Sequence, residues 1–487
     1  MKVKIQGGFV VGYREGHHEL LEGGCVVYEG SEILFVGFPD DPACPAADRV
    51  ISAPGKLVSP GLINLHCIAN IDLQPLRIDV AGGGYLRDKA WFEGEEHIFD
   101  AADFETSARF SVAALLRHGS TTFCNVTTMA SKRFDDPEIE PRLLAEAAAE
   151  LGARAYLAHN FQDHSRYHHS DGSAEVVHDA AAGRRGLERA VRLVEELRDL
   201  GEERIAGFLF PYTTQTCSDP LLKEASRVGR ELGVPIRSHF AQYLYEAEET
   251  LAKRGLSPVE RLAELGVLGP ELTLTHAIYI RGHPQVGGEM DGDLSLLADS
   301  GTHVAHCPVV FSRRGELLRS FQRYLDAGIN LALGTDTVPP DLVAEMRMAS
   351  TLSKVADDDA ESGSAAAVFD AATLGGARAL GRDDLGRLEP GAKADISVFN
   401  LHALHIGVVD DPIKALVHYG NGVDTETVIV GGRTVVENGH VLGTSEFELL
   451  DTAQQAWQRY KKGLIAREPG SRRGEELYPR SFPWRQR

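Results

Sequence analysis

The chain has 487 residues, of which 43% are hydrophobic and 25% charged, enough for a large core and at least one smaller unit. Its 71 acidic residues outnumber 50 Lys and Arg, and the net charge of −21 disfavours nucleic acid and anionic membranes as partners, but suits a small neutral or cationic substrate. The first eight residues lack the apolar core of a signal peptide, and no apolar run is long enough to span a bilayer, so we expect a cytoplasmic protein.

The pattern of predicted strands and helices changes twice along the chain. Residues 1–58 alternate short β-rich runs with Gly and Pro, which predicts a small antiparallel unit. From Pro60 onward, apolar strands alternate with helical stretches rich in Ala, Leu and Glu, such as 141–151, 184–200 and 219–232; this alternation predicts parallel strands with helical crossovers. After about residue 385, short β-rich runs occur again. We therefore predict three parts: a small β-sandwich domain from residues 1–58 plus 386–445, an α/β unit over 59–385, and a C-terminal helical tail over 446–487.

Within the α/β unit, eight apolar runs each deliver a polar residue to their C-terminal end. The runs begin near residue 60 and continue at 120–124, 155–159, 205–210, 235–239, 272–276, 303–306 and 331–336. Eight is the number of strands in a TIM-like (β/α)8 barrel, whose active site lies at the C-terminal ends of the strands. The six cysteines show neither a paired framework nor Cys-x-x-Cys spacing, so we expect reduced thiols, several of them buried.

Four of these strand ends carry residues that bind metals in proteins. They are His66, His239, His276 and Asp336, in that order along the chain. Their order and their surroundings resemble the amidohydrolase superfamily, in its deaminase and chlorohydrolase branch. The resemblance covers residues 1 to about 445 and includes the motifs at 59–68, 238–242, 275–277, 305–308, 334–336 and 371–395. It implies that these four residues hold a catalytic metal.

Two departures from the family pattern concern the number of metal ions. The first-strand motif is His-x-His in the family, but here Ile68 stands where the second His is expected, leaving Asn64 and His66 as an Asn-x-His pair. This variant resembles the phenylurea and molinate hydrolases. The fourth-strand segment 205–212 contains neither the Lys nor the Glu that bridges two metals in binuclear members. The resemblance therefore implies a mononuclear enzyme with one divalent ion per chain; nitrogen ligands with one carboxylate suit zinc, with iron, cobalt or manganese as alternatives.

Several site residues keep two interpretations. Asn64 either binds the metal through its amide oxygen or hydrogen-bonds behind the site, and His276 either binds the metal directly, which we favour, or contacts the attacking water. Gln242 occupies the place of the deaminase proton-shuttling glutamate, but an amide is no general acid; alternatively, it is an outward-packing residue at a helix start. His306 either orients the site or touches substrate.

Two further segments contain aromatic or histidine side chains near the predicted strand ends. The insertion after the first barrel strand offers apolar walls for an aryl or alkyl group, although ordinary loop packing explains any one of its side chains; these are Tyr85, Leu86, Trp91 and Phe92. A second segment is rich in histidines and is predicted to form a mobile, solvated loop; these are His159, His164, His168 and His169.

The predicted reaction is hydrolysis of a C–N or thiocarbamate bond in a small uncharged substrate, foremost a phenylurea. Asp336 accepts the proton of the attacking water and delivers it to the departing amine, because Gln242 has no proton to give. The alternatives are a molinate-type hydrolase, a triazine chlorohydrolase, a heteroaromatic deaminase, or a metal-free binding protein. His239, His276 and Asp336 argue against a metal-free binding protein, because burying a cluster of ionisable groups is costly and serves no purpose in a scaffold. The resemblance also implies a homo-oligomer.

Overall fold

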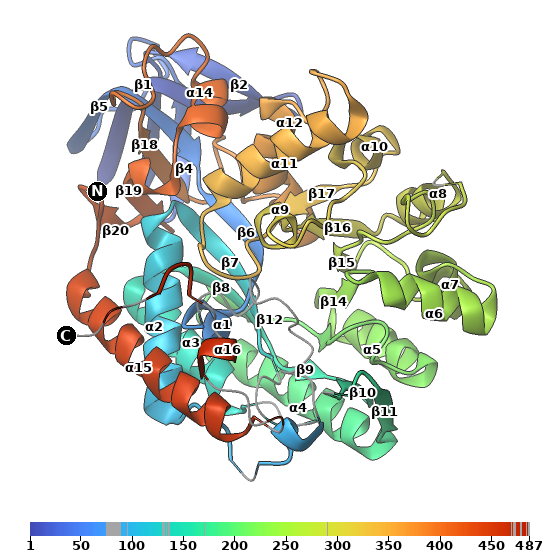
Figure 1. Ribbon diagram of the computed structural model, residues 1–487. Helices are drawn as coiled ribbons and strands as arrows, with labels where there is room; N and C mark the ends of the chain where they lie inside the picture. The colour runs from blue at the N-terminus through green and yellow to red at the C-terminus, as the bar shows by residue number, and fades with distance from the viewer. Residues whose placement is uncertain are drawn as a thin grey trace.

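The computed structural model shown in Figure 1 combines a large antiparallel-rich sheet with two parallel sheets and many helices. It describes residues 1–74, 89–94, 96–128, 132, 134, 137–169, 171–289, 291–468, 470, 474–477, 480–483 and 485. Within this described part of the chain, no helix is long and apolar enough to cross a membrane.

Strands from both ends of the chain form one nine-stranded sheet. Its N-terminal strands are β1 (Lys2–Arg14), β2 (His17–Glu22), β3 (Cys25–Glu29), β4 (Glu32–Gly37) and β5 (Arg49–Pro60); its C-terminal strands are β18 (Ile396–Asn400), β19 (Thr425–Val430), β20 (Arg433–Glu437) and β21 (His440–Val441). The two groups meet where β18 pairs antiparallel with β5, and Figure 1 shows the orange and red strands beside the blue ones. Val58, Ile396 and Ile429 pack together in the core of this sheet. The predicted division into a β-sandwich and two further parts stays a prediction.

The middle of the chain forms parallel sheets, as the alternation of apolar strands and helical stretches predicts, so the fold is mixed α/β. One sheet contains β6 (Leu62–Cys67), β7 (Ser120–Val126), β8 (Arg154–Ala158) and β12 (Ile205–Gly207); the other contains β14 (Ile236–Phe240), β15 (Leu272–His276), β16 (His303–His306) and β17 (Leu331–Leu333). The short strands β9 (Asn160–Phe161) and β13 (Phe210–Pro211) pair with one another. Isolated parallel bridges connect Leu209 with Ile236 and Cys67 with Asp336, so each sheet contacts the other at both edges.

Many helices lie between successive parallel strands, and the helices from Leu342 onward follow the last of these strands, β17. They are α1 (Ala69–Asp72), α2 (Ala101–Arg117), α3 (Ile139–Leu151), α4 (Ala180–Asp199), α5 (Asp219–Leu232), α6 (Leu244–Arg254), α7 (Pro258–Leu265), α8 (Asp291–Ser300), α9 (Pro308–Ser312), α10 (Phe321–Asp326), α11 (Leu342–Asp357), α12 (Ala365–Asp370), α13 (Gly376–Ala379), α14 (Pro412–Tyr419), α15 (Glu446–Ala466) and α16 (Gly474–Leu477); the turns Lys89–Phe92, Ala371–Gly375 and Gly422–Asp424 are irregular helices. Local sequence signals determine where the helices begin and end. Helix α7 begins at a Ser257–Glu260 capping box and stops at Gly266, whose φ of 68° is costly for residues other than glycine.

The long helix α15, near the C-terminus, lies along α2 (Figure 1). Its Arg459 forms an ion pair with the buried Asp103, and its Trp457 and Tyr460 share a core cluster with Trp91. Trp91 therefore packs against the tail, whereas Phe92 lies with its ring centroid 5.7 Å from that of Tyr167. Tyr85 and Leu86, which were also candidates for pocket walls, lie outside the described residues.

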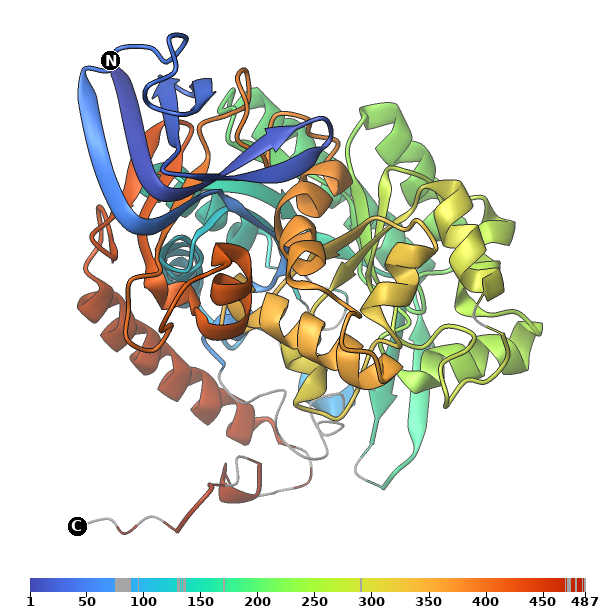
Figure 2. The same cartoon turned by 90° about the horizontal axis from the view of Figure 1, so that it is seen from above.

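The prediction of a solvated loop in the histidine-rich segment is wrong. Strand β10 (His164–His168) pairs antiparallel with β11 (Ala174–His178), and the resulting hairpin projects from the body of the molecule, as Figure 2 shows. His159, which precedes it, is buried at the end of β8. The hairpin exists because Val176 and Tyr167 support extended backbone and the turn contains Gly172 with a φ of 84°.

All six cysteines are free, as the sequence predicts, and five of them are buried.

Candidate metal centre

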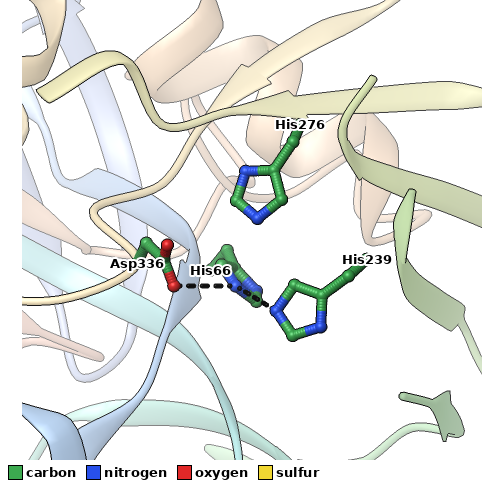
Figure 3. A group of neighbouring side chains, drawn as sticks. All are labelled: His66, His239, His276 and Asp336. Carbon is green, nitrogen blue, oxygen red and sulfur yellow. Dashed lines mark hydrogen bonds and ion pairs between the residues drawn. The ribbon is translucent and has the colours of Figure 1, made fainter. Parts of the chain in front are cut away.

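Three histidines and one aspartate converge at the ends of four parallel strands. His66, His239 and His276 end or lie near the end of β6, β14 and β15, and Asp336 follows β17 (Figure 3). One ligand atom from each lies within 4.8 Å of those of the others. The Nε2 atoms of His66 and His239 are 3.2 Å apart, and Nε2 of His66 is 3.4 Å from Oδ1 of Asp336.

The hydrogen bonding of His239 leaves a lone pair directed into this cluster. Its Nδ1 lies 2.8 Å from the main-chain oxygen of Tyr212, an acceptor, so Nδ1 carries the proton and Nε2 is unprotonated. Both ring nitrogens of His276 and Nδ1 of His66 are buried without a hydrogen-bond partner among the described residues. The unprotonated Nε2 of His239, the partnerless nitrogens of His276, His66 and the carboxylate of Asp336 converge, so this donor set suits a divalent metal.

Burial keeps the three imidazoles neutral. It lowers the pKa of His239 to about 3 and the pKa values of His66 and His276 well below their ordinary value, with nearby positive charge or neighbouring imidazoles as lesser causes. Neutral imidazole is the form that binds metals, so no proton has to leave before a metal enters.

The backbone is strained at two of the four donors. His276 has a φ of 84° and Asp336 a φ of 59°, in the left-handed region that non-glycine residues rarely occupy. Each such residue costs about 1–3 kcal/mol and persists where the surrounding structure enforces it. Here the enforcing contacts include the main-chain oxygen of His66, which accepts hydrogen bonds from the N–H groups of Thr335 and Asp336 at 2.9 Å.

The amide of Asn64 is occupied by hydrogen bonds behind the cluster. Its Oδ1 accepts from the backbone N–H of His66 at 3.3 Å and of Thr335 at 3.2 Å, and its Nδ2 donates to Oγ1 of Thr335 at 2.8 Å. This arrangement favours the second of the two interpretations, in which Asn64 ties the first strand to the loop that carries Asp336.

Two positions depart from the family pattern, Ile68 and the fourth-strand segment 205–212, and both have apolar neighbours. Ile68 is 4% exposed and belongs to an apolar cluster that also contains Phe208 and Phe210. Phe210 comes from the fourth-strand segment, and its ring centroid lies 5.1 Å from that of His239. An aromatic ring of the fourth-strand segment thus lies beside His239.

Gln242 and His306 do not belong to the four-residue cluster. Gln242 is partly exposed and directly precedes Tyr243, the N-cap residue of α6. His306 ends β16 and is buried, and its burial lowers the pKa of the imidazole to about 3. At neutral pH it is therefore a neutral hydrogen-bonding side chain rather than a cation.

Sequence reasoning missed two features of the site. Thr335 holds Asn64, although nothing in the first-strand motif points to a partner so far along the chain. Arg237, two positions before His239 and therefore on the same face of β14, is fully buried, with its guanidinium 5.4 Å from the ring centroid of Phe208. Arg237 was detectable in principle as a charge inside an apolar strand.

Comparison with known proteins identifies the family. The Amidohydrolase family model matches residues 57–435. A 5-methylthioadenosine/S-adenosylhomocysteine deaminase of Natronomonas pharaonis is 32% identical over 455 residues, covering 91% of this chain and 94% of that protein. A 5'-deoxyadenosine deaminase of Methanothermobacter thermautotrophicus is 28% identical over 438 residues, covering 89% and 94%.

Two solved structures share the fold. A zinc-bound adenosine deaminase from Xanthomonas campestris superposes with a TM-score of 0.77 at 23% identity, covering 94% of this chain and 98% of that one. The zinc complex of atrazine chlorohydrolase from Arthrobacter aurescens gives 0.75 at 23% identity, covering 93% and 100%. The fold and the site thus define a metal-dependent enzyme of the class that acts on carbon–nitrogen bonds. The chain belongs to the amidohydrolase family.

Proposed function

We propose that His66, His239, His276 and Asp336 hold one divalent metal ion, zinc in the resting enzyme. The convergence of their donor atoms within 4.8 Å supports this set, and the apolar contacts of Ile68 and Phe210 support a single ion. Direct binding by His276 is supported by its two buried nitrogens, which have no protein partner within the described structure.

We also propose that the eight parallel strands close into a (β/α)8 barrel with the metal at its C-terminal end. The parallel bridges Leu209 to Ile236 and Cys67 to Asp336 support closure, since each links an edge of one four-stranded sheet to an edge of the other. The second bridge also brings the first and last metal-binding segments together.

We propose that the enzyme hydrolyses a C–N bond in a small uncharged urea-type substrate, with a phenylurea as the first candidate. The observation that carries this proposal is Gln242. A heteroaromatic ring must be protonated during deamination, and the amide at this position has no proton to transfer near neutral pH. A urea instead needs polarisation of a poorly electrophilic carbonyl and a proton for its leaving amine.

One carboxylate serves both proton transfers in this scheme. The bound metal supplies Lewis-acid polarisation and lowers the pKa of a reacting water. Asp336 accepts a proton from the attacking water as the C–O bond forms, and then gives that proton to the departing nitrogen as the C–N bond breaks. The neutral imidazoles of His66 and His239 keep their donor atoms in place, and Asn64 fixes the Asp336 loop against β6.

Deamination of an adenosine-type nucleoside is the second candidate. Its support is the similarity over nearly the whole chain to proteins named as methylthioadenosine, S-adenosylhomocysteine and deoxyadenosine deaminases. In that case a group other than Gln242 protonates the purine ring.

A substrate panel with the zinc-loaded enzyme separates the two candidates. Aryl ureas, thiocarbamates, triazines and adenosine nucleosides are compared by release of the substituted amine and of ammonia. We expect amine release from an aryl urea and no ammonia from nucleosides. Ammonia release from nucleosides with inert ureas would overturn the first candidate in favour of the second.

The same substrate panel tests whether Asp336 carries out both proton transfers. We expect Asp336→Asn to fold, to keep much of its metal and to lose about 10²–10⁴-fold in turnover, the range for loss of a general acid–base. Near-normal turnover in this variant would refute the double proton-transfer role.

A further inference from the structure

A second group of metal-binding side chains lies at the base of the β10–β11 hairpin, away from the candidate metal centre. Asp163, His164 and His178 each offer a ligand atom, and these atoms lie within 4.8 Å of one another. His164 begins β10 and His178 ends β11, and the two are direct partners across the strand pair. Residues facing each other across two strands present their side chains side by side, which brings the two imidazoles together.

The ligand atoms lie close enough for one ion to replace the hydrogen bond between His164 and Asp163. Nδ1 of His164 is 2.7 Å from Oδ1 of Asp163, and Nε2 of His178 is 3.7 Å from Oδ2 of the same carboxylate. The two imidazole rings are stacked, with centroids 4.4 Å apart and planes at 28°. Both rings therefore turn one edge toward the same carboxylate.

The carboxylate itself is preorganised by the body of the protein. Asp163 is 2% exposed, and it accepts hydrogen bonds from the backbone N–H of Ser218 at 2.8 Å and from the Ser218 hydroxyl. A β-carbon on Gly183, in the first turn of α4, would lie 2.7 Å from Cβ of Asp163, so the helix closes off its other side. Burial alone raises the pKa of Asp163, but the hydrogen bonds from His164 and Ser218 outweigh it and leave the pKa below its ordinary value.

We propose that Asp163, His164 and His178 form a peripheral binding site for a borderline-soft transition-metal ion such as Zn²⁺. Two imidazoles and one carboxylate are a donor set for zinc, nickel or copper rather than for magnesium or calcium, which prefer oxygen ligands alone. His178 is half exposed, so the ion enters from solvent. The site fills when zinc is supplied in excess of the ion that the proposed interior site takes up.

Occupation of this site fixes the hairpin to the rest of the molecule. The ion joins the first residue of β10 to the last residue of β11, and through Asp163 it joins both to the start of α5. The hairpin in turn contacts α6 through the ion pair of Arg166 with Glu249, and the Lys89 turn through Glu175 at 2.9 Å. An ion at the base thus stabilises a flap held between α6 and the segment that follows the first metal-binding strand.

Equilibrium dialysis of the interior-metal-loaded enzyme against zinc tests the site. We expect about one additional zinc per chain in the wild type and in the control His169→Ala, which changes another histidine of the same hairpin. We expect no additional zinc in His178→Ala, whose half-exposed position makes the substitution compatible with folding. Asp163→Asn should also lose the additional zinc.

Tryptic cleavage at Arg166 gives an independent measurement. Because the ion binds only the closed hairpin, zinc at ten times its dissociation constant should slow cleavage roughly tenfold in the wild type and leave the rate in His178→Ala unchanged. The proposal is overturned if the wild type takes up no further zinc, or if wild type and His178→Ala take up equal amounts.

Discussion

The buried carboxyl group of Asp72 makes the stability of the fold depend on pH. Asp72 ends α1, the short helix that follows the metal-binding strand β6, and it is 5% exposed. Ser111 donates a hydrogen bond of 2.6 Å to its Oδ2, while Oδ1 is buried without a partner among the described residues. Burial, with a further contribution from the charge of Asp336, raises the pKa of Asp72 from 3.8 to about 7.

The sign and size of the effect follow from linkage. Between pH 3.8 and 7 the unfolded chain ionises at Asp72 while the folded chain stays protonated, so the free energy of unfolding falls as the pH rises. At 1.36 kcal/mol per pKa unit, the full difference is about 4 kcal/mol above pH 7. The variant Asp72→Asn removes the ionisation and keeps an oxygen that accepts from Ser111, so it should be more stable than the wild type by up to about this amount at pH 8.

Urea unfolding of both proteins at a series of pH values from 5 to 8 measures this difference. We expect the stability advantage of Asp72→Asn over the wild type to grow with pH up to about pH 7 and then to level off, with Asp451→Asn at an exposed position as the control. A constant difference between Asp72→Asn and the wild type across the series would refute the claim that Asp72 stays protonated in the folded protein.

Three further predictions address one buried ion pair and two residues beside the candidate metal centre. Arg154→Met leaves Asp395 buried without its ion-pair partner at 2.9 Å and should cost about 3–5 kcal/mol in urea unfolding, with recovery when Asp395→Leu is added; no recovery would argue against an unpaired charge as the cause. Asn64→Ala should lower kcat at least about tenfold while metal content is retained, because the Asp336 loop loses its tie to β6; unchanged kcat would exclude this positioning role. Ile68→His should lower stability by about 1–3 kcal/mol without adding a metal in elemental analysis, since its imidazole enters an apolar cluster; a second tightly bound interior ion would contradict it.

The sequence predicted best those features whose signal is local. Each strand of the parallel sheets is a short apolar run, and each proposed ligand follows such a run, so the positions of His239 and His276 could be read directly. Helices α3, α4 and α5 also follow their expected ranges closely, because their apolar residues recur at helical spacing and their ends carry caps.

Features that depend on distant partners could not be predicted. The hydrogen bonds of Asn64 depend on Thr335, which the chain delivers only when the first and last parallel strands meet. Trp91 resembled a pocket wall because the tail helix that covers it lies at the other end of the sequence. The β10–β11 hairpin was hidden by its polar, histidine-rich composition, which is typical of loops.

The most direct test of the account is anomalous diffraction at the zinc absorption edge from crystals of the protein grown without added metal. The account predicts one interior peak, within bonding distance of His66, His239, His276 and Asp336, and loss of both peak and turnover in His239→Ala. An interior without a peak in an active preparation, or two ions side by side at these residues, would contradict it.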